Sequence, residues 1–125
     1  MITTLTSSTY FSYIRGNPRY TVVTIKSADC KPCIKGYELF EKLVKRYEAE
    51  SNKTFHFAVY ELIKADAKFI KETLGITGVP TFDIYNAGGE RVFRTSSPKN
   101  FGILEDYMES IETVQAIDNN STPLP

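Results

Sequence analysis

Cys30 and Cys33 stand two residues apart in the segment "ADCKPCIKGYELFEK", and the 125-residue chain has no other cysteine. Such a pair could form a disulfide, bind a metal or be two inert buried thiols. A disulfide across so short a loop stabilises by only roughly 2 kcal/mol, against about 3 kcal/mol for a 15-residue loop. Zinc needs four ligands, and only His56 could join the two cysteines, so we expect no metal site. Redox exchange is therefore favoured, with two unreactive thiols as the alternative.

The position of Cys30 favours a reactive thiolate. It follows the apolar, β-branched run 20–27, which predicts a buried strand, and it precedes a predicted helix. Its sulfur would thus face unpaired N–H groups and the positive end of the helix dipole. Lowering a thiol pKa from about 8.5 to about 7 would make roughly half of the thiol reactive at neutral pH. Lys31 would assist this shift, and Asp29 would oppose it.

Cys33 lies one helical turn after Cys30, where it could attack a mixed disulfide formed by Cys30 and so act as the resolving thiol. Pro32 suits the first turn of the helix, where no backbone donor is lost. No histidine lies between the cysteines to stabilise the thiolate strongly. We therefore expect a disulfide reductant rather than a strong oxidant.

The elements that must position this pair follow from hydrophobic spacing and turn signals. Asp66 is the expected N-cap and Gly75 the left-handed end of a short helix, while Ser97 and Pro98 open the last helix. The turn "NAGG" joins two strands into a hairpin. The order of the elements is helix, strand, helix, strand, helix, hairpin and helix. This order predicts an α/β fold with a parallel strand pair, helices on its faces and antiparallel strands at one edge. The predicted helices are 7–15, 33–50, 65–75 and 97–111, and the predicted strands are 20–27, 54–62 and the hairpin 81–95.

Length and charge narrow the class of protein. The length predicts one domain, which we assign to residues 1–116, followed by a flexible tail at 117–125. Fifteen basic and fifteen acidic side chains cancel, which disfavours binding to nucleic acid or to a membrane surface. The first residues show no signal-peptide pattern and no stretch reaches transmembrane length, so we expect a cytoplasmic protein.

A second motif lies in "GITGVPTFDIY", where Pro80 stands at the first residue of a predicted strand. Cys30-Lys31-Pro32-Cys33 after a buried strand, together with Gly78-Val79-Pro80-Thr81 before the hairpin, resembles the thioredoxin family over most of the chain up to about Thr113. The resemblance implies a thioredoxin-like fold, with a central mixed β-sheet flanked by about four α-helices. It also implies that Pro80 is cis and packs beside the cysteines, and that the backbone of Val79 pairs with an extended substrate.

Five positions depart from the pattern of that family. Asp29 stands where the family usually has Trp, Lys31 replaces the usual glycine, and Ser97 falls near the glycine that the family has before its last helix. Thr24 occupies the position of a buried acid that assists deprotonation of the second cysteine, which threonine cannot do. Glu61, near a family lysine, could supply the missing carboxylate. We therefore expect a more acidic docking surface than is usual.

The resemblance implies a thiol-disulfide oxidoreductase that reduces protein disulfides through Cys30 and Cys33. A separate disulfide reductase would regenerate the pair, and no bound cofactor is expected. The missing Trp and acid favour an alternative, a thioredoxin-fold binding module or subunit with little redox activity. A third reading, an isomerase or oxidase, would require an oxidising compartment.

Overall fold

A five-stranded mixed sheet forms the centre of the protein, for which a computed structural model describes residues 1–120. The strand order is β1-β3-β2-β4-β5. β3 pairs in parallel with β1 and β2, and β4 pairs antiparallel with β2 and β5, which confirms the predicted mixed sheet. The strands are β1 (Ile2–Leu5), β2 (Tyr20–Lys26), β3 (Phe55–Glu61), β4 (Thr81–Tyr85) and β5 (Arg91–Ser96).

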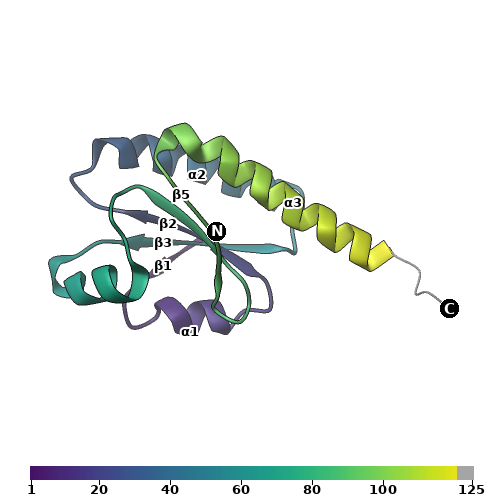
Figure 1. The fold of residues 1–125 in the computed structure, drawn as a ribbon. Helices are drawn as coiled ribbons and strands as arrows, with labels where there is room; N and C mark the ends of the chain where they lie inside the picture. Colours follow the sequence, from purple (N-terminus) through teal and green to yellow (C-terminus); the bar gives the residue numbers. More distant parts are fainter. Residues whose placement is uncertain (121–125) are drawn as a thin grey trace.

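Helices cover both faces of the sheet (Figure 1). α2 (Lys31–Ala49) and α3 (Phe101–Asn120) lie on one face, and α1 (Tyr10–Arg15) lies on the other. Three short turns complete the fold: the 3₁₀ segments η1 (Lys64–Asp66) and η3 (Pro98–Asn100), and the π-helix η2 (Phe69–Leu74). Within residues 1–120, no helix combines the length and the apolar character needed to cross a bilayer.

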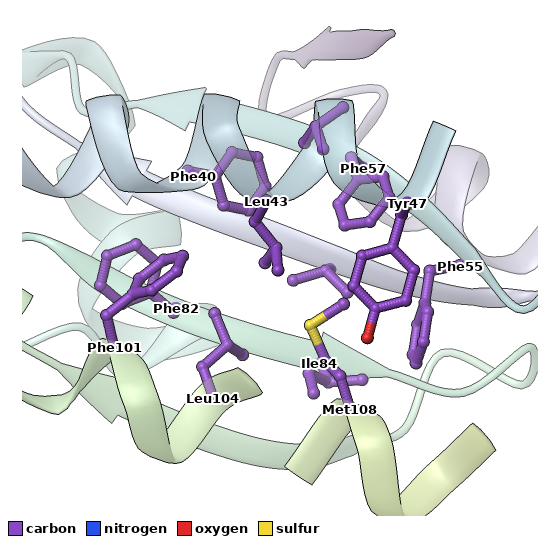
Figure 2. Packing of buried hydrophobic residues seen from close by; sticks show 12 residues of the cluster. Phe40, Leu43, Tyr47, Phe55, Phe57, Phe82, Ile84, Phe101, Leu104 and Met108 are labelled. Atoms are coloured by element: carbon purple, nitrogen blue, oxygen red, sulfur yellow. The ribbon is translucent and has the colours of Figure 1, made fainter. Parts of the chain in front are cut away.

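β2 is buried along most of its length because successive side chains enter different cores. Val22 points towards α2 and α3, whereas Val23 points towards α1 and η2. The first of these cores is rich in aromatic side chains (Figure 2), with Phe40 and Tyr47 of α2 facing Phe57 of β3. Its other large members are Leu43, Phe55, Phe82, Ile84, Phe101, Leu104 and Met108.

One strand and one helix start differ from the sequence prediction. β1 was not predicted, because "ITTL" has only four residues and contains two threonines, so no clear period appears. It pairs with β3 at the edge of the sheet. α1 begins at Tyr10 rather than near residue 7, because Thr6 and Thr9 form a hydroxyl-capped turn in which the Thr6 N–H donates to Thr9 Oγ1 at 2.9 Å.

The helix predicted at 65–75 is present but is wound differently, as a 3₁₀ turn followed by a π-helix. Asp66 is not its N-cap; its carboxylate instead accepts a hydrogen bond of 2.6 Å from the hydroxyl of Tyr60. Phe69 packs edge-on against the rings of Tyr10 and Tyr60, which places it in the core under α1. Gly75 ends the segment with a φ of 65°, as predicted.

The start and end of the last helix follow the prediction only in part. Ser97 caps η3 by accepting a hydrogen bond from the Lys99 N–H at 3.3 Å, and Pro98 occupies the first helical position. α3 continues through Asn120, so the domain boundary predicted between residues 116 and 117 falls inside this helix. The rest of the predicted tail, residues 121–125, lies outside the described residues.

α2 approaches the start of β4 very closely at Gly36. A Cβ atom at this position would lie 3.1 Å from Cγ of Pro80 and 3.2 Å from Cζ of Phe82. Glycine inside a helix costs about 1 kcal/mol relative to alanine, so a packing reason is needed to explain it. The missing side chain lets the first turns of α2 lie directly against Pro80.

Neighbouring residues on α3 provide a matched test of the core. Leu104 is fully buried and Ile103 is 53% exposed. We expect Leu104→Ala to lower the free energy of unfolding by about 2–5 kcal/mol, because it leaves a cavity between α3 and the sheet. Ile103→Ala should change it by less than about 0.5 kcal/mol. Urea unfolding curves measure both, and similar losses for the two variants would contradict the core described here.

The Gly36–Pro80 contact leads to a second prediction. Gly36→Val should lower the free energy of unfolding by about 1–3 kcal/mol, because two methyl groups must fit where even one carbon is tight. Gly102 offers a control on the other long helix, since a Cβ there would meet no atom within 4 Å. Thermal unfolding would show the contrast. If Gly36→Val were as stable as Gly102→Val, the close approach would not constrain the fold.

Candidate active site

Cys30 and Cys33 form a disulfide at the start of α2, with their Cα atoms 5.2 Å apart. Cys30 is the N-cap of the helix, and its Sγ accepts a hydrogen bond of 3.1 Å from the Cys33 N–H. Cys30 is half-buried, whereas Cys33 is only 2% exposed. Cys30 is therefore the sulfur that another molecule can reach, and a helix-end N–H is aligned to stabilise negative charge on it.

The second predicted motif lies beside the disulfide. The Val79–Pro80 peptide bond is cis, and the Val79 carbonyl oxygen is 3.7 Å from Cys30 Sγ. The residues on either side hold this bend in place: Thr81 Oγ1 donates to the Gly78 carbonyl at 2.7 Å, and the Ser97 N–H donates to the Pro80 carbonyl at 3.1 Å. Two segments almost fifty residues apart in the sequence thus meet where β2 ends and β4 begins.

The charged neighbours of Cys30 lie at the surface. Lys31 and Asp29 are exposed, and neither has an ion-pair partner within 4.0 Å among residues 1–120. Pro32 lies in the first turn of α2, as predicted, and is exposed too. Lys31 and Asp29 can therefore act on the sulfur only through a solvated field, which salt weakens.

A groove of about 530 Å³ opens next to the two cysteines on the side of α2. Lys26 is one of its lining residues, with its ammonium 3.6 Å from the Glu61 carboxylate and 4.6 Å from the centre of the Tyr37 ring. Burial and the nearby Glu41 carboxylate raise the pKa of Tyr37. Beyond this ion pair the lining is acidic and partly apolar, contributed by Glu38, Glu41, Ala28 and Ile34, the last of which is 71% exposed.

Thr24 and Glu61 differ in how far they can replace the missing buried acid. Thr24 is 1% exposed, and its Oγ1 has no hydrogen-bond partner among the described residues. It has no carboxylate, so it cannot accept a proton at neutral pH. Glu61 is half-exposed, paired with Lys26, and lines the same groove as Cys33. A role for Glu61 in proton transfer stays a prediction.

A buried ion pair near the site was not predicted from the sequence. Asp83 of β4 is fully buried and binds Arg94 of β5 at 2.7 Å. Hydrogen bonding to this carboxylate raises the pKa of Arg94. The only sequence signal was a single acid within the apolar strand "TFDIY". Among the described residues, no cluster of three or more His, Cys, Asp or Glu side chains could hold a metal ion.

Comparison with known proteins places this geometry in a structural class. No protein-family model and no curated protein sequence matches the chain. Its fold is similar to that of spinach chloroplast thioredoxin f, with a TM-score of 0.70 and 23% identity, covering 86% of this chain and 91% of that one. Thioredoxin from Trypanosoma brucei brucei gives a TM-score of 0.72 at 22% identity, covering 90% and 92%.

A third similar structure is thioredoxin f2 in a complex with ferredoxin:thioredoxin reductase, at a TM-score of 0.70 and 21% identity, covering 91% of this chain and 94% of that one. With identities below 25%, these TM-scores establish a shared fold and nothing beyond it. The protein therefore has a thioredoxin-like α/β fold, with a Cys-Lys-Pro-Cys disulfide at the start of α2 and Pro80 beside it.

Proposed function

We propose that the protein is a thiol-disulfide oxidoreductase that reduces disulfides in other proteins. The observation that carries this proposal is the position of Cys30, a partly buried residue that lines the groove. Its Sγ accepts the Cys33 N–H at the helix start and lies 3.7 Å from the Val79 carbonyl. A reactive sulfur and a main-chain hydrogen-bonding group are thus side by side. An inert structural disulfide would need neither of them.

In the reduced protein, the Cys30 thiolate attacks one sulfur of a client disulfide. A mixed disulfide forms, and the other client sulfur leaves as a thiolate that takes up a proton. Cys33, next to Cys30, then attacks Cys30 Sγ and releases the second client thiol. Two electrons pass from the cysteine pair to the client, and the protein ends in the disulfide form that the structure shows.

Val79 and Pro80 give the proposed site its preference for polypeptides. The Val79 carbonyl lies next to Cys30, where an extended client segment could pair with the Val79 backbone as an added strand. Main-chain pairing does not depend on the client side chains, so it suits a reductant with several clients. Lys31, Pro32 and Asp29 form the exposed rim over which the client would approach.

The cycle also requires a source of electrons. The two sulfurs carry the electrons themselves, so we propose that no cofactor is bound and that a separate disulfide reductase restores the dithiol. The similar thioredoxin f2, which was crystallised with ferredoxin:thioredoxin reductase, supports a partner of this kind. A protein that donates electrons to disulfides works in a reducing compartment, so we place it in the cytoplasm.

Insulin reduction driven by dithiothreitol tests the proposal. We expect the wild type to accelerate precipitation of the insulin B chain well above the rate with dithiothreitol alone, and Cys30→Ser to abolish the acceleration, because the attacking sulfur is lost. Ser27→Ala, a substitution in the same groove, is the matched control and should retain activity. No acceleration by the wild type would favour the binding-module alternative and overturn the proposed activity.

Cys33→Ser separates attack from resolution. This variant keeps the Cys30 thiol but cannot release a bound client, so mixed disulfides should accumulate. Non-reducing electrophoresis after incubation with oxidised insulin should show an adduct that dithiothreitol removes. The double variant Cys30→Ser/Cys33→Ser should form none. An equal yield of adduct from Cys30→Ser would mean that Cys33 is the attacking sulfur.

A further inference from the structure

The Asp83–Arg94 ion pair lies between β4 and β5, on the side of the sheet that faces α1. Arg94 Nε donates to Asp83 Oδ1 at 2.7 Å, and Arg94 Nη2 donates to Oδ2 at 2.8 Å. The two residues are register partners on adjacent strands. The hydroxyl of Tyr85 donates to Oδ2 at 2.9 Å and in turn lies 2.9 Å from the hydroxyl of Tyr10. Two side chains, Arg94 and Tyr85, therefore hold the carboxylate through three hydrogen bonds.

Arg94 also binds the end of η2. Its Nη2 donates to the Leu74 carbonyl at 2.8 Å, and its Nη1 donates to the Gly75 carbonyl at 3.1 Å. These are carbonyl groups that a helix end leaves without partners in its own backbone. Because the guanidinium is planar and rigid, one side chain joins the buried carboxylate of β4 to the end of η2.

The two ends of residues 75–80, which we call the proline segment, are held by this one ion pair. The segment leaves η2 at Gly75, which Arg94 binds, and enters β4 at Thr81, two residues before Asp83. The segment is also held by backbone bonds: the N–H groups of Gly75 and Ile76 donate to the Ile70 carbonyl, and the Ser97 N–H donates to the Pro80 carbonyl. In addition, Thr81 Oγ1 donates to the Gly78 carbonyl. Thr77 and Gly78 themselves are exposed.

Stability alone is a poor explanation for this ion pair. Removing two charges from water offsets much of their attraction, and apolar side chains of similar size often stabilise as well or better. Apolar side chains could not, however, donate to the Leu74 and Gly75 carbonyls. Arg91 of β5 also reaches the Leu74 carbonyl, at 3.5 Å. Arg94, however, binds both carbonyls and the Asp83 carboxylate, so it links the end of η2 directly to β4.

We propose that Asp83 and Arg94 are positioning residues, which hold the proline segment so that the Val79 backbone faces Cys30 at the spacing an extended polypeptide disulfide needs. This inference rests on the proposed disulfide reduction. Under this proposal, the ion pair favours polypeptide disulfides over small disulfides. A small disulfide needs only the sulfur of Cys30, whereas a polypeptide must also pair with Val79.

The kinetic test compares two uncharged substrates with the reduced protein. One is a pair of linear peptides joined by a single disulfide, and the other is bis(2-hydroxyethyl) disulfide. Arg94→Met should raise the KM for the peptide disulfide roughly five- to twenty-fold, the effect of losing one or two main-chain hydrogen bonds. The rate with bis(2-hydroxyethyl) disulfide should stay within about twofold of wild type.

Three further variants show whether a raised KM comes from a displaced proline segment or from a destabilised protein. Arg94→Lys keeps the charge but cannot bind the carboxylate and both carbonyls, so it should behave like Arg94→Met. The apolar pair Asp83→Leu/Arg94→Met leaves no uncompensated buried charge and should be folded, yet it should still show the raised KM. Arg46→Met is the matched control, because it removes an arginine that pairs with Glu105 at 2.9 Å between α2 and α3.

Amide hydrogen exchange of the oxidised protein tests the positioning independently of any activity. In Arg94→Met, and in Asp83→Leu/Arg94→Met, the amides of Ile76 and Ser97 should exchange at least about tenfold faster than in the wild type, with Arg46→Met unchanged. Unchanged exchange, or an equal loss of rate with both disulfides, would overturn the positioning role. A wild type that reduces neither disulfide would refute the proposed function, while the exchange result would still decide whether Arg94 holds the segment.

Discussion

The contact between Gly36 and Pro80 is the constraint on which the arrangement of the site depends. α2 must lie directly against the first residue of β4, because only then do the N-cap sulfur and the Val79 carbonyl come within 3.7 Å of each other. The sheet order makes this possible, since β2, which leads into α2, is the immediate neighbour of β4. A side chain on Gly36 would push apart the helix and strand that bring the two motifs together.

Each face of the sheet buries one threonine of β2, Thr21 or Thr24, whose hydroxyl has no hydrogen-bond partner among the described residues, but the face of α1 also buries a charge. On the face of α2 and α3, the buried polar side chain of β2 is Thr24, which carries no charge and leaves its hydroxyl unpaired. On the face of α1, β4 buries the carboxylate of Asp83 and satisfies it with Arg94 and Tyr85. The buried charge is thus separated from Cys33 by the sheet. Glu61, paired with Lys26, lines the same groove as Cys33.

Sequence reasoning could predict those features that have a local period or a local turn signal. The long helix after Cys33, the buried strands, the hairpin and the left-handed Gly75 all depend on neighbouring residues, and all are present. β1 and the start of α1 were missed, because four residues show no period and a threonine turn competes with the helix. The Asp83–Arg94 pair could not be predicted, because it depends on strand register and on a helix end twenty residues before Arg94.

The charged side chains around the site fall into two groups. Those at the surface affect how fast a client arrives, and Arg94 affects how the client is bound. Glu38, Glu41 and Lys31 lie at the surface, so ionic strength screens their fields, and they can affect mainly how fast a charged client arrives. Arg94 binds the buried Asp83 carboxylate and the Leu74 carbonyl through hydrogen bonds of 2.8 Å or less that are partly removed from water, where salt has less effect. The surface charges and the Asp83–Arg94 ion pair can therefore change independently. New surface charges would alter the choice of client without moving Val79 relative to Cys30.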